Sequence, residues 1–340
     1  MVRQALRDGI GRVAGAPALL AGVYLATLLL AAPLALALHG TIESHLGASV
    51  AADRAAEGVH WAWWEEFQAQ AEGIERTFAP SIIGFAAPLA NLSALADGNG
   101  PPAALLALVA LYIAVWSFLI GGILDRLARC RRVTAAEFFS ACGVHFFRFC
   151  RLAAVAGLAY WALFGLLHGW LFDDLYGAAT RDVTVERTAF LMRVAVYLLF
   201  AAVLLPVNML FDYVKIRTVV EDRRSIIGAL LAAGRFVWRR PGATLGLYAL
   251  TGLLFVLVLA VYAAVVPGAD GGGARVWLTL VVGQAYIVAR LAVKLVFYAA
   301  QTAYFQSQLA HAGYVAAPRP AWPDSPAAEA ITASAPREAS

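Results

Sequence analysis

The chain has 340 residues, of which 61% are hydrophobic and 14% are charged, and its mean hydropathy is +0.72. Soluble domains carry roughly 25% charged residues, so this chain has too little polar surface to cover a water-facing globule. The composition therefore predicts an integral membrane protein and excludes a cytosolic enzyme and a disulfide-rich secreted domain. The net charge of +4 is too small to indicate a nucleic-acid partner.

Six stretches are apolar over about the 20 residues that a transmembrane helix needs. They run from Ala16 to Leu38, Ala103 to Leu124, Leu152 to Phe172, Ala189 to Leu210, Ala243 to Val266, and Val276 to Tyr298. None alternates polar and apolar residues as the strands of a membrane barrel do. We therefore predict an all-α, polytopic membrane protein with six transmembrane helices.

The arginines before the first stretch resemble the basic region of a secretory signal peptide. The apolar run that follows is longer than the roughly 7–15 residues of a signal core, so we expect a retained membrane anchor. Lys and Arg concentrate in cytoplasmic loops. With the N-terminus inside, the cytoplasmic segments hold 18 Lys and Arg residues and the outer segments hold 5. We therefore predict that both termini are cytoplasmic.

A basic-flanked stretch with apolar residues at helical spacing precedes the first, third and fifth predicted helices. The apolar positions are Val2, Leu6, Ile10 and Val13; then Phe138/Phe139, Cys142, Phe146 and Phe149/Cys150; then Ile226/Ile227, Leu230/Leu231, Gly234 and Val237/Trp238. Such stretches lie in the membrane interface, with their cations toward anionic headgroups. The helix after each stretch carries a glycine followed closely by a tyrosine: Tyr24, Tyr160 and Tyr248.

These similarities predict three parallel repeats, each an interfacial helix followed by a transmembrane hairpin. The alternative is that three basic-flanked hairpins resemble one another by chance. Residues 1–313 would form the transmembrane domain, with 39–102 as its outer loop, and the Ala/Pro/Ser-rich residues 314–340 a disordered cytoplasmic tail. Within the loop, the aromatic run from His60 to Phe67 is expected on the outer membrane surface. The proline-broken stretch from Ala79 to Leu95 is expected to be interfacial or re-entrant.

Arg290 and Lys294 are the strongest candidates for a functional site, because both lie within the sixth predicted helix. They are four residues apart and so share one face of that helix. A cation near the middle of a span costs about 2.5–3.5 kcal/mol on insertion scales, so a compensating group is expected. Gln284 lies about two turns away on a similar face. One interpretation is an inward-facing cationic pocket for an anion such as a lipid phosphate.

The other interpretation of these cations is structural. Lys294 would extend toward the interface, while Arg290 would pair with a polar side chain or a backbone carbonyl. The candidate polar partners are Asp125, Asp212 and Asn208. Asp125 and Asp212 hold equivalent positions in the predicted repeat, and each precedes cations with which it can pair locally.

The sequence contains no motif that carries a known chemistry. It lacks a His-Glu-x-x-His zinc motif, a phosphate-binding loop, a Gly-x-Ser-x-Gly elbow and paired intramembrane aspartates. The spacing of Cys142, His145 and Cys150 fits no compact zinc site. We therefore expect a protein that is not an enzyme and that has no cofactor and no metal site.

The run from Phe211 to Ser225, followed by an amphipathic stretch and Arg239-Arg240-Pro241, resembles uncharacterised six-helix bacterial inner-membrane proteins. It is more distantly similar to the membrane domain attached to some glycerophosphodiester phosphodiesterases. The resemblance covers about a third of the chain. It implies a multi-pass protein of the bacterial plasma membrane with no assigned activity. The soluble phosphodiesterase domain has no counterpart here, so no catalytic residue carries over.

Together these observations predict a non-enzymatic membrane protein that binds anionic lipid or a membrane partner through the inward-facing cations. That partner would be another membrane protein or a second copy of this chain. The alternative is a small transporter or permease component that moves an anionic solute or lipid.

Overall fold

The computed structural model describes residues 1–47, 49–57, 60–78, 93–99, 103–266 and 273–308. Within them all regular elements are helical, and six helical segments are long and apolar enough to cross a membrane. These are α2 (Pro17–Leu46), α6 (Leu106–Arg129), the continuous segment Ala135–Thr180, α9 (Glu186–Val220), α11 (Pro241–Val265) and α12 (Ala274–Gln308). The prediction of an all-α protein with six spans is confirmed, and the chain is an integral membrane protein.

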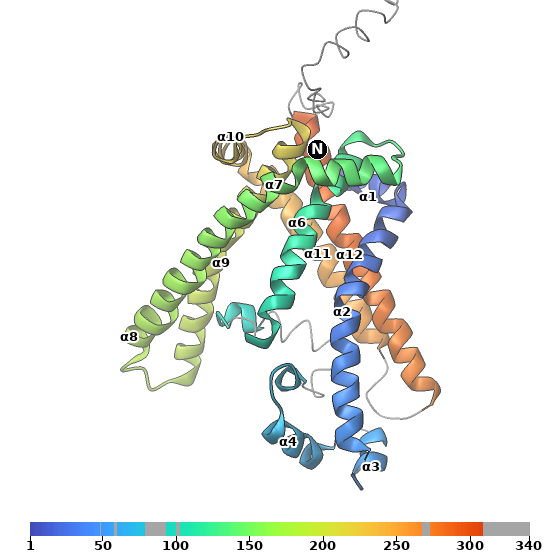
Figure 1. Cartoon of the computed structure of the whole chain (residues 1–340). Coiled ribbons are helices and arrows are strands. Elements are labelled where there is room, and N and C mark those ends of the chain that lie inside the picture. Colours follow the sequence, from blue (N-terminus) through green and yellow to red (C-terminus); the bar gives the residue numbers. More distant parts are fainter. Residues whose placement is uncertain (48, 58–59, 79–92, 100–102, 267–272, 309–340) are drawn as a thin grey trace, which may run out of the picture.

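Two amphipathic helices, α1 (Val2–Ala14) and α10 (Ile226–Arg239), lie at one end of the bundle together with the start of α7 (Ala135–Trp161) (Figure 1). We call this the basic end. Helix α1 packs on α12, and α10 packs on α9. The short helices α3 (Ala52–Glu57) and α4 (Trp61–Gln70) lie at the opposite end. The threefold repeat itself stays a prediction.

The second amphipathic stretch is not the separate interfacial helix that was predicted. It forms the first part of α7, which continues through the π-helical turns Ala162–Leu167 and Trp170–Leu175 into α8 (Tyr176–Thr180). The physical reason is the absence of a helix breaker. Gly15 and Pro17 separate α1 from α2, and Pro241 begins α11, whereas no glycine or proline follows Cys150 before Gly157.

The buried faces of the amphipathic helices differ from the predicted apolar stripes. Helix α1 buries Ala5, Gly9 and Val13, and α10 buries Ile226, Ala229, Ala233 and Phe236. Small residues bring two helix backbones close together, as Ala5 and Gly9 do in α1 and Ala229 and Ala233 do in α10. The larger apolar side chains Ile10, Ile227, Leu231 and Trp238 remain exposed.

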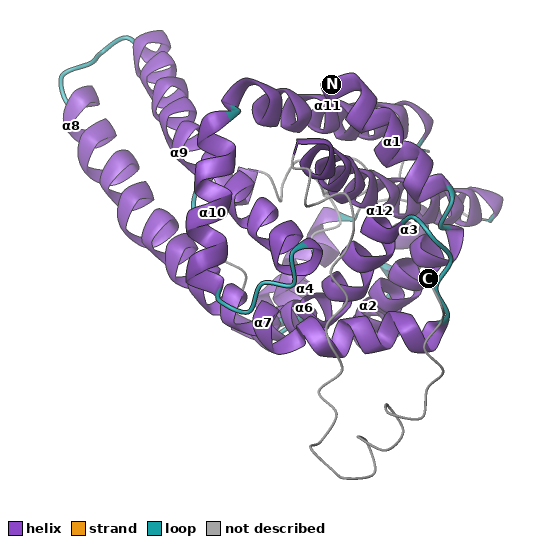
Figure 2. Ribbon diagram, turned by 90° about the horizontal axis from the view of Figure 1, so that it is seen from above, coloured by secondary structure: helices purple, strands orange, loops and turns teal. Residues whose placement is uncertain are grey.

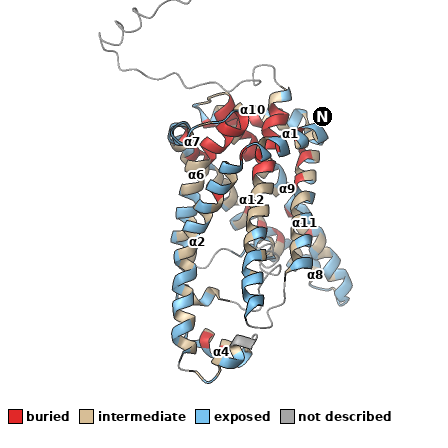
Figure 3. Ribbon diagram, turned by 90° about the vertical axis from the view of Figure 1, so that its right-hand side faces the viewer, coloured by how far each residue is buried: buried red, intermediate tan, exposed pale blue. Residues whose placement is uncertain are grey.

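The main hydrophobic core lies at the basic end (Figure 3). It joins the last turns of α6, α9 and α12 with the buried faces of α1 and α10; fully buried members include Ile123, Leu127, Ile216, Leu295 and Phe305. Helices α9 and α12 each have 35 residues, which corresponds to about 52 Å at 1.5 Å per residue. The hydrocarbon is only about 30 Å thick. Both helices are therefore long enough for their last turns, which contribute to the core, to lie outside it.

Helices α7, α8 and α9 form a hairpin that projects to one side of the bundle (Figures 1 and 2). The hairpin has a small core of its own, made by Leu163, Leu171, Val196 and Phe200. Residues 93–99 fasten onto it: the His168 Nε2 atom lies 2.8 Å from the Ala96 carbonyl oxygen, and Arg193 pairs with Asp97 at 3.3 Å. Away from the basic end, the hairpin is therefore attached to the rest of the chain through residues 93–99.

The outer loop contains an aromatic cluster around α4. Trp63 and Phe67 are buried against His45 of α2, and the Trp63 indole donates a hydrogen bond to His45 Nδ1 at 3.0 Å. The loop therefore begins later than predicted, because α2 continues to Leu46. Residues 79–92 of the predicted re-entrant stretch, and the tail predicted over 314–340, lie outside the described residues.

Candidate anion-binding site

Lys294 lies near the middle of α12 and faces two aromatic rings of α6. Its ammonium nitrogen is 3.5 Å from the centroid of the Trp116 ring and donates a 3.3 Å hydrogen bond to the Tyr112 hydroxyl oxygen. A cation over the face of a tryptophan is stabilised by the ring quadrupole, by about 2 kcal/mol when water is excluded. The two rings hold the ammonium group in place, but they do not neutralise its charge.

Arg290 lies one turn before Lys294 on the same helix and is exposed. In the described part of the chain, no hydrogen bond or ion pair joins its guanidinium to another residue. Gln284 has a partner: its Oε1 atom accepts a 2.9 Å hydrogen bond from the Tyr24 hydroxyl of α2. The polar face of α12 therefore holds two cations, and no carboxylate among the described residues is hydrogen-bonded or ion-paired to either.

The candidate partners predicted for Arg290 are engaged elsewhere. Asp212 accepts a 2.8 Å hydrogen bond from Lys215 and a second one from the Tyr248 hydroxyl. The Asn208 side-chain oxygen accepts from the Tyr160 hydroxyl. The structure therefore does not contain the pairing of Arg290 with Asp212 or Asn208 that the structural interpretation proposed.

Asp125 pairs locally with Arg129, one turn later on α6, at 2.8 Å and 2.9 Å. Asp212 and Lys215 make the corresponding pair on α9. Neither carboxylate therefore joins the cations of α12 in a single site. Each belongs to the packing of the basic end instead.

The tyrosines of the predicted repeat each donate to a buried or half-buried polar side chain. Tyr24 reaches Gln284, Tyr160 reaches Asn208, and Tyr248 reaches Asp212. The bonds of Tyr24 and Tyr248 join helices from different predicted hairpins. The spacing of residues within one helix does not reveal such partners. A buried tyrosine hydroxyl usually has an acceptor, so their recurrence was a usable signal, although the buried hydroxyls of Tyr213 and Tyr286 have no partner among the described residues.

The residues that sequence reasoning missed are the aromatic partners of Lys294. Tyr112 and Trp116 are four residues apart on α6, with their rings stacked at 6.3 Å between centroids. Their spacing is visible in the sequence. Which helix they face is not, because that depends on how α6 and α12 pack.

Comparison of the chain with models of known protein families, with curated proteins and with solved structures finds no match.

Proposed function

We propose that this integral membrane protein is not an enzyme and binds the phosphate of an anionic lipid through Arg290 and Lys294. We further propose that the protein lies in the bacterial plasma membrane, with its basic end in the cytosol. The observation that carries it is the pair of cations on α12, which are held by aromatic rings or exposed and have no carboxylate partner among the described residues. Unpaired cations at the edge of the hydrocarbon attract anionic headgroups, and a lipid phosphate supplies the missing negative charge.

The length of α12 supports a lipid phosphate as that anion. If α12 enters the hydrocarbon near Ala274, 30 Å of hydrocarbon corresponds to about 20 residues, which ends close to Lys294. Both cations would then lie near the level of the headgroups at the basic side. Arg290 is exposed on the outside of the helix, where a lipid can reach it.

Native mass spectrometry tests the proposal directly. The wild-type protein and the variants Arg290→Ala and Lys294→Ala are released from detergent micelles that contain equal concentrations of phosphatidylglycerol and phosphatidylcholine. We expect each variant to retain less phosphatidylglycerol, by about tenfold for a loss of 1.4 kcal/mol, with phosphatidylcholine retention unchanged.

Arg187→Ala is the matched control, because it removes one exposed arginine from the first turn of α9. Lys294→Arg keeps the charge over Trp116 and should restore retention. Equal retention of phosphatidylglycerol by wild type, Arg290→Ala and Lys294→Ala would refute the proposed function.

A further inference from the structure

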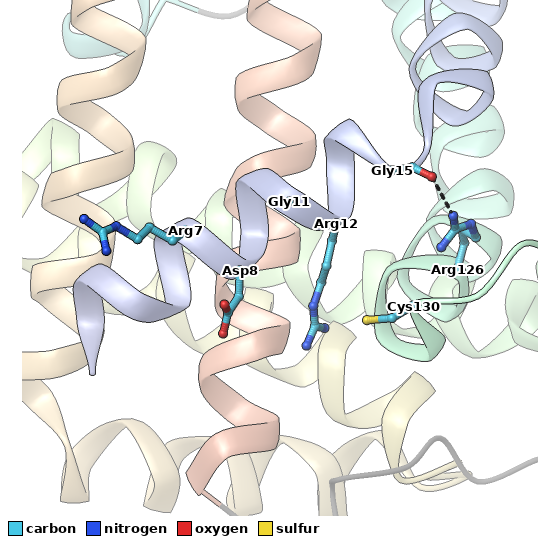
Figure 4. A pocket seen from close by; sticks show the side chains of 7 residues that line it. All are labelled: Arg7, Asp8, Gly11, Arg12, Gly15, Arg126 and Cys130. Atoms are coloured by element: carbon cyan, nitrogen blue, oxygen red, sulfur yellow. Dashed lines mark hydrogen bonds between the residues drawn. The ribbon is translucent and has the colours of Figure 1, made fainter.

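A second cationic site lies at the basic end, between α1 and the C-terminal end of α6. It is a hollow of about 420 Å³, lined by Arg7, Asp8, Gly11 and Arg12 of α1 and by Arg126 and Cys130 (Figure 4). Pockets that bind small molecules typically measure about 300–1,000 Å³. The hollow is therefore larger than a bare phosphate ion and suits a phosphate ester.

Two of the arginines are held rigidly by neutral oxygens. Arg12 donates from Nη1 to the Leu127 carbonyl at 3.0 Å and to Gln306 Oε1 at 2.9 Å. Arg126 is only 9% exposed, and its Nη2 atom donates to the Gly15 carbonyl at 3.0 Å. Each guanidinium carries five N–H donors, so both keep donors that point to no other group in the described residues. None of these three contacts cancels a full charge.

Four other arginines of the basic end have carboxylate partners. Arg129 pairs with Asp125, Arg148 with Asp222, and both Arg217 and Arg223 with Glu221. The hollow is thus a place where positive charge is fixed in position without a carboxylate bonded to it. Its own carboxylate, Asp8, makes no hydrogen bond with Arg7 or Arg12.

Gly11 keeps the hollow open. A Cβ atom added at Gly11 would meet no atom within 4 Å, so a side chain there would extend into open space. Gly9, two residues earlier, is different, because its added Cβ would lie 2.7 Å from the backbone nitrogen of Ala300. One face of α1 therefore needs its glycine for packing, whereas a Cβ atom at Gly11, which borders the hollow, would touch no described residue.

We propose that this hollow binds a phosphate ester, with Arg12 and Arg126 donating to the phosphate and Arg7 at its rim. The lining side chains sum to a formal charge of +2, which matches a phosphate dianion. Arginine is well suited to this role, because its planar fork of donors fits phosphate oxygens. Asp8 repels the phosphate and offers an acceptor to a hydroxyl or amino group elsewhere on the ligand.

Two kinds of ligand carry a phosphate ester, a soluble molecule and a lipid headgroup, and two probes distinguish between them. Isothermal titration of the full-length protein, in nanodiscs of phosphatidylcholine, uses phosphoethanolamine and then dihexanoyl phosphatidic acid. The measurements are made in the Arg290→Ala background, which weakens the site on α12, and binding that remains there is not altered by variants of the hollow. Binding of both probes indicates a soluble ester, and binding of the lipid alone indicates a headgroup.

Gly11→Leu should weaken the binding of either probe at least tenfold by filling the hollow. Leucine favours a helix more than glycine does, so lost binding would not follow from unfolding of α1. Gly143→Leu is the control, because Gly143 is also exposed, lies on the amphipathic part of α7 and has no atom within 4 Å of its added Cβ. It should leave binding unchanged.

Asp8→Asn should change binding in the opposite direction. It removes a carboxylate that repels the phosphate, so dihexanoyl phosphatidic acid should bind more tightly. The proposal is overturned if neither probe binds the Arg290→Ala protein. It is also overturned if Gly11→Leu and Gly143→Leu bind the probes equally well.

Discussion

The ion pair of Asp212 and Lys215 should stabilise the basic end only as a pair. Lys215 donates to Asp212 at 2.8 Å, and the two side chains are 26% and 12% exposed, respectively. Asp212→Ala leaves the ammonium without its carboxylate where water is largely excluded, and Tyr248 loses its acceptor. Breaking a buried pair in this way costs about 3–5 kcal/mol. We expect a loss of that size in the free energy of unfolding.

A double-mutant cycle separates the pair from its surroundings. Asp212→Asn keeps an oxygen that can accept from Tyr248, and Lys215→Met keeps the bulk of the side chain without its charge. Each single variant leaves one charge unpaired, whereas the double variant leaves none. The double variant should therefore be more stable than the sum of the two losses predicts, by at least about 1 kcal/mol.

Unfolding in dodecyl maltoside by added SDS, followed by circular dichroism, gives the free energies of unfolding of the wild type and the three variants. The Lys215 nitrogen also lies 5.7 Å from the centroid of the Tyr298 ring, which holds the ammonium in place when Asp212 is absent. Losses that simply add to within 0.5 kcal/mol, the usual scatter for independent sites, would show that the two charges do not stabilise each other.

Three further predictions concern glycines and a carboxylate that contact other helices. Gly9→Ala should lower the thermal unfolding midpoint in detergent, because its Cβ would lie 2.7 Å from the Ala300 backbone; Gly11→Ala, which meets nothing, should leave it unchanged or raise it. Gly98→Ala should destabilise the contact of residues 93–99 with the α7–α9 hairpin, since Gly98 has a φ of +71° and its Cβ would lie 2.8 Å from His168; faster hydrogen exchange in 93–99 would report this. The hydrogen bond from Tyr197 and the charge of Arg193 lower the pKa of Asp97 below its ordinary 3.8. The contact is therefore complete above that pH and is lost as the pH falls through the lowered pKa; Tyr197→Phe should raise the pKa of the Asp97 carboxyl in an NMR titration.

Each of these three predictions has a clear contrary outcome. Equal unfolding midpoints for Gly9→Ala and Gly11→Ala would show that α1 and α12 are not closely packed. Unchanged exchange in Gly98→Ala would remove the proposed steric conflict with His168. An Asp97 pKa that is the same with and without the Tyr197 hydroxyl would show that this hydrogen bond does not form.

The sequence predicted the six spans because hydrocarbon accepts few other solutions. A run of about 20 apolar residues must be helical there, whatever surrounds it. The same reasoning placed Arg290 and Lys294 on one face of α12, as the structure has them. Helical periodicity and hydropathy are properties of one segment, and they predicted the features that depend on one segment.

Features that depend on two segments were predicted less well. Hydropathy ends the sixth span at Tyr298, yet α12 continues to Gln308 because its small residues Ala299, Ala300 and Ala303 are buried in the core of the basic end. The partner of Asp212 is Tyr248 from another hairpin. The hollow beside Arg126 exists because α1 crosses the end of α6. None of these follows from spacing within a helix.

The position of the main core has a consequence for how the protein responds to its membrane. Apolar packing gains no hydrophobic stabilisation where the alternative neighbour is a lipid tail, but it does where the alternative is water. The helices are therefore joined firmly where they emerge and weakly within the acyl chains. A thinner or thicker bilayer should change the tilt of the hairpins while the joined ends keep their arrangement, so that bilayer thickness would control the spacing of the helices on the far side.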